Sequence, residues 1–239
     1  MQVYQFQPPS IVIAPSAAQT VFSTTFNLPP WTQGGGLSPL PADDLIRRYG
    51  DWTAAGQPDA IIAAANYPGG GGGLGFRHQR GTGVNSCGGG LLIGMPSPLT
   101  EMWVRQYMRN ALSYVGGHPA YTKDHYWNVG GAFLIFGYQG GAWGLHTSNG
   151  SVNIPSSIKY EATDDGQWHC YEYHAKQAGS GGFVEMWIDG VLCLQRTINL
   201  GSTPWEYLAL GENQRDVSVA GYTDYDDFAV SVTGRIGVL

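Results

Sequence analysis

The chain has 239 residues, a net charge of −6 at pH 7, and charged side chains at only 13% of its positions. This balance excludes the strongly basic surface by which nucleic-acid-binding proteins are recognised. The 36 glycines and 14 prolines would suit a disordered chain, but the 14 Tyr, 8 Trp and 8 Phe residues exclude one. The length is sufficient for one large β-sandwich with its own core.

Residues 1–17 are predicted to form an arm ahead of a single domain over residues 18–239. The arm is apolar but broken by prolines, so we expect it to pack on its own domain or to join a homo-oligomer or a capsid or appendage neighbour. A first edge strand of the same domain is the alternative. The stretch lacks the basic start and long apolar core of a secretory signal peptide. No segment reaches the roughly 18 apolar residues of a membrane span, so we expect no membrane partner.

Further along, residues 20–26 are rich in β-branched and aromatic side chains and are predicted to form a strand. Residues 43–49 are predicted to form a short helix, because an aspartate can cap its start and a glycine follows its end. A second helical turn is expected within 58–65. The five consecutive glycines at 69–73 are expected to form a flexible surface loop.

From Gly90 onward, short strand-like runs follow one another at close spacing. They cover residues 90–95, 101–110, 131–139, 142–147, 167–176, 183–189, 191–197, 205–211 and 225–232. Turn-forming residues separate most of them, and this spacing is typical of an all-β sandwich or barrel.

Two neighbouring strands allow a register to be predicted. Alternation in residues 167–176 places Tyr173 on an apolar face and Glu172 on a polar face. Matching apolar face to apolar face pairs Tyr173 with Met186, and Glu172 with Trp187 or a residue nearby.

An Asp-Gly pair at 189–190 then predicts a type I′ turn, which would place Cys193 opposite Met186 on the apolar face. Cys170 would lie on the other face, so we expect free thiols and no disulfide between Cys170 and Cys193. The third cysteine is Cys87, and an odd count argues against a disulfide framework.

Three stretches in this order are informative about the family: QWHCYEYHAK (167–176), VEMWIDGVL (184–192) and YTDYDDFAVSV (222–232). Together they resemble the concanavalin A-like lectin/glucanase superfamily, including its laminin-G-like members. The strand TEMWVRQYMRN (100–110) resembles the central strand of some lyase-like members. The resemblance implies an all-β, two-sheet antiparallel jelly-roll sandwich, here with one or two short helices. Because this fold hosts lectins, glycosidases, polysaccharide lyases and structural virion proteins, it does not specify one function.

One strand carries the main candidate for ligand binding. Four residues alternate along it and share a face: Trp103, Arg105, Tyr107 and Arg109. Aromatic planes can stack on sugar rings, and Arg side chains pair with carboxylate or sulfate groups. With Trp187, these residues form the predicted glycan-binding set. The alternative is that the aromatic residues are half-buried in the sandwich, with the Arg stems packed against them.

A second polar group is expected on the hairpin. Glu172, His174, Glu185 and Trp187 are predicted to share its polar face. Two carboxylates near a histidine could act as general acid and base. The favoured interpretation is that they form cross-strand pairs on a solvated face.

The resemblance also implies a possible lyase site. Polysaccharide lyases of this fold use Tyr or His as the base, with Lys, Arg or Gln to neutralise the uronate. The residues Lys123, His125, Tyr126 and Trp127 follow a Gly-rich loop. If the protein is an enzyme, the predicted catalytic residues are Arg105, Tyr107 and His125, with Tyr138 as a further candidate. Ordinary loop and strand roles are the alternative.

Three aspartates near the last strand, Asp224, Asp226 and Asp227, are predicted as a possible structural calcium site, since Ca²⁺ prefers clustered oxygen ligands. A turn with self-capping Asp residues is the alternative. No other cofactor is expected.

Two functions remain. The first is a non-catalytic glycan-binding or structural surface protein, such as a virion decoration or appendage protein. The second is a polysaccharide lyase or other enzyme that cleaves an acidic polysaccharide. We favour the first, because no complete catalytic set can be assembled, and we expect an extracellular or virion-surface location with carbohydrate as the partner.

Overall fold

A computed structural model describes residues 20–26, 39–40, 43–49, 60–80, 90–110, 121–129, 132–139, 142–147, 150–153, 165–215 and 221–239. The arm predicted over 1–17 and the third cysteine, Cys87, lie outside the described residues. No helix in the described part of the chain is long and apolar enough to cross a membrane.

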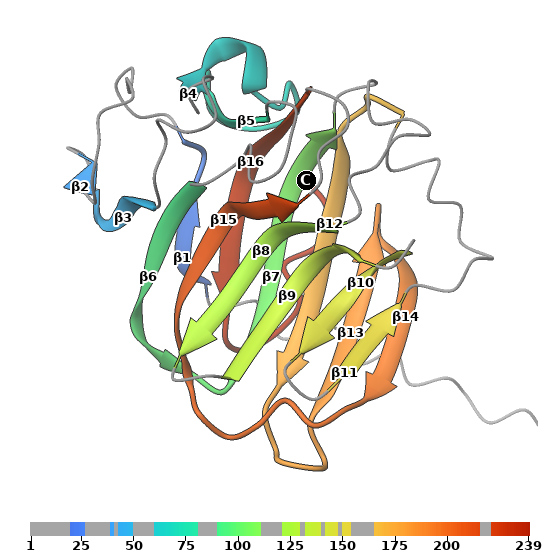
Figure 1. Ribbon diagram of the computed structural model, residues 1–239. Helices are drawn as coiled ribbons and strands as arrows, with labels where there is room; N and C mark the ends of the chain where they lie inside the picture. The colour runs from blue at the N-terminus through green and yellow to red at the C-terminus, as the bar shows by residue number, and fades with distance from the viewer. Residues whose placement is uncertain are drawn as a thin grey trace, which may run out of the picture.

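The described strands form two antiparallel sheets that pack face to face (Figure 1). In spatial order, the first sheet contains β14 (Val191–Thr197), β13 (Phe183–Ile188), β12 (His169–Lys176), β7 (Glu101–Asn110), β16 (Gly221–Ser231), β5 (Gly75–Arg80) and β4 (Ala60–Ile62), and β1 (Thr20–Thr24) pairs with β16. The second contains β11 (Gly150–Asn153), β10 (Ala142–Thr147), β9 (Ala132–Gln139), β8 (Tyr121–Val129), β15 (Trp205–Arg215), β6 (Gly90–Leu99), β3 (Asp43–Tyr49) and β2 (Pro39–Leu40). The predicted all-β sandwich is confirmed.

The core lies between the sheets, because each long strand turns alternate side chains inward. On β7, Met102, Val104 and Met108 are buried in the core, and alternation turns Trp103, Arg105 and Tyr107 to the opposite face of the sheet. Trp127 on β8 crosses the core and donates its indole N–H to the hydroxyl of Tyr173 on β12, so the polar ends of both side chains are satisfied.

The hairpin register is confirmed at the predicted pairs. Tyr173 lies opposite Met186 and Glu172 lies opposite Trp187. Asp189 and Gly190 both have positive φ, at 50° and 81°, as a type I′ turn requires. Both described cysteines are free.

The position of Cys193 was predicted wrongly by one residue. A bulge between Met186 and Trp187 makes Leu194, not Cys193, the partner of Met186. A bulge adds an unpaired residue to one strand and shifts the pairs beyond it. Cys193 nevertheless packs in the core, and Cys170 lies on the outward face, as expected.

The helix predicted over 43–49 is wrong, because these residues form β3 and pair with β6, with Ile46 opposite Ile93. Pairing between distant strands overrides a local helix signal of a few tenths of a kcal/mol per residue. The helical turn expected within 58–65 is present only as the 3₁₀ turn Ala63–Ala65, which follows β4.

The glycine run at 69–73 was expected to be a flexible surface loop, and it lies at the surface, with Gly69, Gly71 and Gly73 exposed and Gly70 half-buried. A Cβ at Gly70 would overlap Oδ2 of Asp227, so the backbone packs directly on that carboxylate. Gly70 therefore lies directly against Asp227 of β16, while a Cβ at Gly71 or Gly73 would point into open space.

Candidate functional site

The side of the first sheet that faces away from the core, here called the outer face, gathers the predicted polar and aromatic residues from several strands. Register places His174 beside Trp103, Glu172 beside Arg105, and Cys170 beside Tyr107. On the other flank, Asp226 lies beside Tyr107 and Asp224 beside Arg109. The stripe on β7, the polar group of the hairpin and the aspartates of β16 therefore form one continuous surface.

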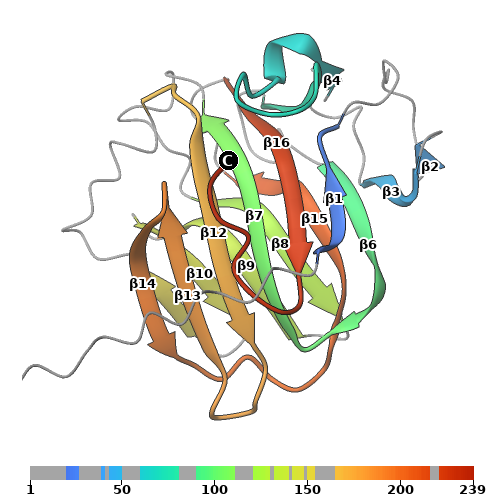
Figure 2. The same cartoon turned by 180° about the vertical axis from the view of Figure 1, so that it is seen from behind.

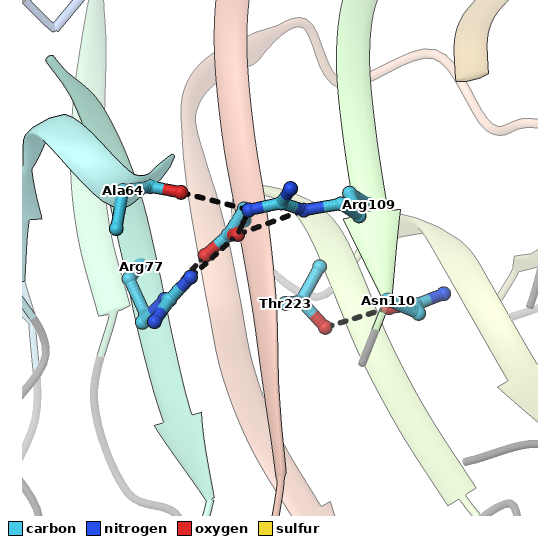
Figure 3. A network of polar contacts seen from close by, with 6 residues as sticks. Ala64, Arg77, Arg109, Asn110 and Thr223 are labelled. Carbon is cyan, nitrogen blue, oxygen red and sulfur yellow. Dashed lines mark hydrogen bonds and ion pairs between the residues drawn. The ribbon is translucent and has the colours of Figure 1, made fainter. Parts of the chain in front are cut away.

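At one end of the outer face, a fully buried carboxylate holds two guanidinium groups (Figure 3). Arg77 donates from Nε to Oδ1 of Asp224 at 2.6 Å and from Nη2 to Oδ2 at 2.9 Å. Arg109 donates from Nη2 to Oδ2 at 2.6 Å and also to the Ala64 carbonyl oxygen at 2.7 Å. These charge-assisted bonds fix both Arg side chains, so neither is a free cation for an acidic ligand.

An aromatic stack continues from this ion-pair cluster. The ring of Tyr67 stacks on Tyr107 with centroids 3.9 Å apart, and Trp168 meets the edge of Tyr67 at 5.8 Å. The Arg109 guanidinium lies 5.0 Å from the centre of the Trp168 ring. Burial raises the pKa of the Tyr107 phenol, so this hydroxyl stays protonated at physiological pH.

On β16, next to Tyr107 of this stack, two consecutive buried carboxyl groups have raised pKa values. Burial raises the pKa of Asp226 to about 7, and this outweighs the backbone hydrogen bonds from Tyr67 and Asp227, which act in the opposite direction. Burial also raises the pKa of Asp227, although the nearby Arg105 charge partly counteracts it. Asp227 has φ of 46°, so it occupies a backbone conformation that is unfavourable for a non-glycine residue.

The three aspartates do not surround a common space for a metal. Asp224 is occupied by Arg77 and Arg109, whereas Asp226 accepts bonds from backbone N–H groups. Within the described ranges, no group of three or more His, Cys, Asp or Glu residues is arranged to hold a metal ion. The calcium site therefore stays a prediction that this geometry does not support.

At the other end of the outer face, His174 joins two carboxylates. Its Nε2 lies 3.0 Å from Oε1 of Glu101, and its Nδ1 lies 3.2 Å from Oε2 of Glu185. The ring also stacks on Trp103 at 3.9 Å, and Lys176 donates to Glu101 at 2.8 Å. Burial alone would raise the pKa of Glu101, but the bonds from Lys176 and His174 lower it overall.

The polar hairpin residues were expected on a solvated face, and this is wrong for Glu172 and His174, which are both buried. His174 is enclosed by Trp103 and its carboxylate partners. Glu172 is covered by a segment of chain that is far from it in sequence.

That covering chain is the crossing segment, defined as residues 233–239. Figure 2 shows the chain turning back after β16 and passing in front of β7 and β12. Arg235 donates from Nε to Oε2 of Glu172 at 2.8 Å and also from Nη2, and its guanidinium lies 4.7 Å from the centre of the Trp187 ring. The backbone N–H of Gly237 donates to Oε1 of Glu172 at 2.7 Å.

The same segment reaches the β7 stripe. Arg105 donates from Nη1 to the Gly237 carbonyl oxygen at 3.3 Å, and the Leu239 backbone N–H donates to the Tyr107 hydroxyl at 2.8 Å. All the predicted glycan-binding residues thus lie on one face, but the segment occupies its centre.

The predicted catalytic residues are not brought together on one sheet. Arg105 and Tyr107 lie on β7 of the first sheet, whereas His125 lies on β8 of the second, paired with Leu210 and Phe136. Tyr138 also belongs to the second sheet, on β9. The catalytic set stays a prediction.

The sequence matches no protein-family model, and no curated protein matches it either. Several solved structures resemble the fold. The cellulose induced protein Cip1 is 14% identical with a TM-score of 0.60, over 91% of this chain and 100% of that one. Domain 4 of AbnA, a GH43 extracellular arabinanase from Geobacillus stearothermophilus, in complex with arabinotriose, is 14% identical with a TM-score of 0.57, over 92% of this chain and 95% of that one.

A structure of botulinum neurotoxin type C is 13% identical with a TM-score of 0.56, over 79% of this chain and 43% of that one. The chain therefore spans less than half of that toxin structure. These similarities show the fold.

Sequence reasoning missed the crossing segment and Tyr67. Neither carries a local signal, because Arg235 is an isolated cation between glycines and Tyr67 precedes a glycine run. Trp168 belongs to a recognised strand motif, but its contact with Tyr67 depends on the packing of β4 and the 3₁₀ turn at the end of the sheet.

Proposed function

We propose that this domain binds carbohydrate through the outer face of its first sheet. The observation that carries the proposal is the register, which gathers partly exposed Trp rings and hydrogen-bonding charged groups on one surface. Trp103 and Trp187 flank Glu172 and Arg105 on adjacent strands. Carbohydrate recognition requires this combination, because a ring plane packs on the apolar side of a sugar while polar groups bind its hydroxyls.

The fold neighbours support the same proposal. Domain 4 of AbnA is in complex with arabinotriose, and cell entry of botulinum neurotoxin type C depends on interaction with two ganglioside molecules. Two sandwiches of this shape are thus associated with sugar-containing ligands. The similarity is in the fold, so the proposal rests on the residues of the outer face.

Binding is favoured over cleavage because the candidate bases on the described outer face are buried or already hydrogen-bonded. Asp226 has a pKa raised to about 7, but it is fully buried and both of its oxygens accept backbone N–H groups. The Tyr107 hydroxyl accepts a hydrogen bond from Leu239, and burial raises its pKa. His174 already lies between two carboxylates. A general base needs both access to the substrate and a pKa near the working pH.

The test is a binding screen on neutral and uronate-containing polysaccharides by affinity electrophoresis and titration calorimetry. Trp187→Ala should weaken binding about tenfold or more, the equivalent of about 1.4 kcal/mol from one lost stacking contact. The matched control is Tyr207→Ala, an aromatic truncation on the second sheet. Equal affinity in both variants would place the binding surface elsewhere.

Ultraviolet absorbance in the same mixtures detects the unsaturated products of a lyase, and their formation would replace the binding proposal with an enzymatic one.

The narrower roles expected from the sequence stay predictions. They are membership of the concanavalin A-like superfamily, a virion decoration or appendage role, a polysaccharide lyase activity and an extracellular or virion-surface location. A contribution of the arm at 1–17 to an oligomer or capsid likewise stays a prediction.

A further inference from the structure

We propose that the crossing segment, residues 233–239, is a removable occupant of the carbohydrate face, and that a neutral carbohydrate binds by displacing it. This inference rests on the proposed function and concerns how the same site is controlled. The segment contacts the centre of the outer face at four residues of that face: Arg105, Tyr107, Glu172 and Trp187.

The segment satisfies these four residues in the way a sugar would. A flat group, the Arg235 guanidinium, covers the Trp187 ring. Donors meet the Glu172 carboxylate, and an acceptor, the Gly237 carbonyl oxygen, meets Arg105. Sugar hydroxyl groups can both donate and accept, so one ring above Trp187 could replace these bonds.

The attachment is of a kind that can open locally. Within the described chain, no backbone-to-backbone hydrogen bond joins residues 234–239 to the sheet. The hydrogen bonds that attach Arg235, Gly237 and Leu239 each involve a side chain of the outer face. Val238 and Leu239 are 52% and 60% exposed. Val232, just before the segment, packs against the core, so the chain is anchored up to that residue. Segments with few buried apolar contacts open at a fraction of the global free energy.

Displacement of the segment does not leave the Glu172 carboxylate buried without a partner. Glu172 is only 2% exposed because the segment covers it. When the segment leaves, its carboxylate meets solvent or ligand and still lies opposite Arg105 in the register. No unpaired charge is left buried, which would otherwise be the main cost of opening.

The charge of Glu172 also selects the ligand. In the closed form, the Arg235 cation lies against this carboxylate. A uronate in the same place would bring a second negative charge beside it, whereas a neutral sugar would not. The displaced state therefore favours neutral polysaccharides over acidic ones.

The consequence can be measured as a change in affinity. If the open form makes up about 1 to 10% of the molecules, the apparent Kd of the full chain is roughly 10- to 100-fold weaker than that of a permanently open chain. Ending the chain after Val232 should give this increase in affinity for a neutral polysaccharide. Addition of the free peptide TGRIGVL, which reproduces residues 233–239, should reverse the increase and change the tryptophan fluorescence of the shortened protein.

Two point variants test the same idea without shortening the chain. Arg235→Ala removes the contacts with Glu172 and Trp187, and its control is Arg196→Ala, an exposed Arg on β14. Gly237→Pro removes the N–H that binds Glu172 and is incompatible with the φ of 86° at that position. Both should tighten carbohydrate binding, and hydrogen exchange at the Leu239 amide should be faster than at the β7 amides.

The outcomes separate the two proposals. Equal affinity of the full and shortened chains for the same polysaccharide would overturn displacement and leave carbohydrate binding intact. Tighter binding of uronate than of neutral polysaccharide by the shortened chain would overturn the choice of ligand class. Failure of every variant to bind any polysaccharide would refute the proposed function, and displacement by carbohydrate with it. Exchange at Leu239 as slow as in β7 would show that the segment is a permanent part of the sheet.

Discussion

The clearest stability prediction concerns Asp224, whose side chain is fully buried between two cations. Asp224→Asn keeps the size of the side chain but removes the charge that Arg77 and Arg109 contact through four N–H donors. Breaking a buried ion pair by removal of one partner costs about 3–5 kcal/mol, because the remaining charge is left without compensation. The Arg77 and Arg109 side chains retain 14% and 24% exposure, so water partly solvates them in the variant. We therefore expect a loss near the lower limit, about 3 kcal/mol.

Urea unfolding followed by tryptophan fluorescence measures this loss as a lower midpoint with an unchanged slope. For a chain of this size, the melting temperature should fall by roughly 6–12 °C. Glu206→Gln, which neutralises an exposed carboxylate on β15, is the control and should change stability by less than about 0.5 kcal/mol. In an Arg77→Met background, Asp224→Asn should cost less, because one of the two stranded cations is already absent. A loss below about 1 kcal/mol for Asp224→Asn alone would refute the conclusion that this carboxylate holds the end of the sheet together.

Two further predictions follow from buried polar groups. The pKa of Asp226 is raised to about 7 in the folded protein from an ordinary value of 3.8, so the folded state holds the extra proton between these limits and stability should fall as pH rises from about 4 to about 7. Urea midpoints across this range should show the decrease, and Asp226→Asn should abolish this component of the slope; an unchanged slope would contradict the assignment. Tyr173→Phe should cost about 1–3 kcal/mol in the same unfolding assay, because it leaves the Trp127 indole N–H buried without its acceptor. Tyr207→Phe on the second sheet is the matched control, and an equal effect of the two changes would contradict the core hydrogen bond.

The sequence was informative where structure depends on short-range pattern. The register of β12 and β13 was predicted correctly at Tyr173 and Met186, because apolar alternation and a two-residue Asp-Gly turn act over a few residues. The shared face of Trp103, Arg105, Tyr107 and Arg109 was predictable for the same reason, since side chains on one strand alternate with a period of two. The error at Cys193 arose from a bulge, which no local pattern indicates.

Other features of the fold and of the candidate site depend on contacts between residues that are distant in the chain. Residues 43–49 became β3 because β6 offered a partner strand, and the local helix signal was too weak to compete. Asp224 forms ion pairs with two Arg side chains because β5 and β7, which carry them, pair with β16 on either side.

By itself, the sequence determined an all-β sandwich, the hairpin register and the residues that share the outer face. Only the tertiary structure decided which of those residues are accessible. Arg235 meets Glu172 and Trp187 across more than forty positions of chain, so no local rule of alternation or turn geometry could predict that contact. The outer face is therefore a surface whose composition follows from strand periodicity, whereas its closed state follows from the path of the crossing segment over it.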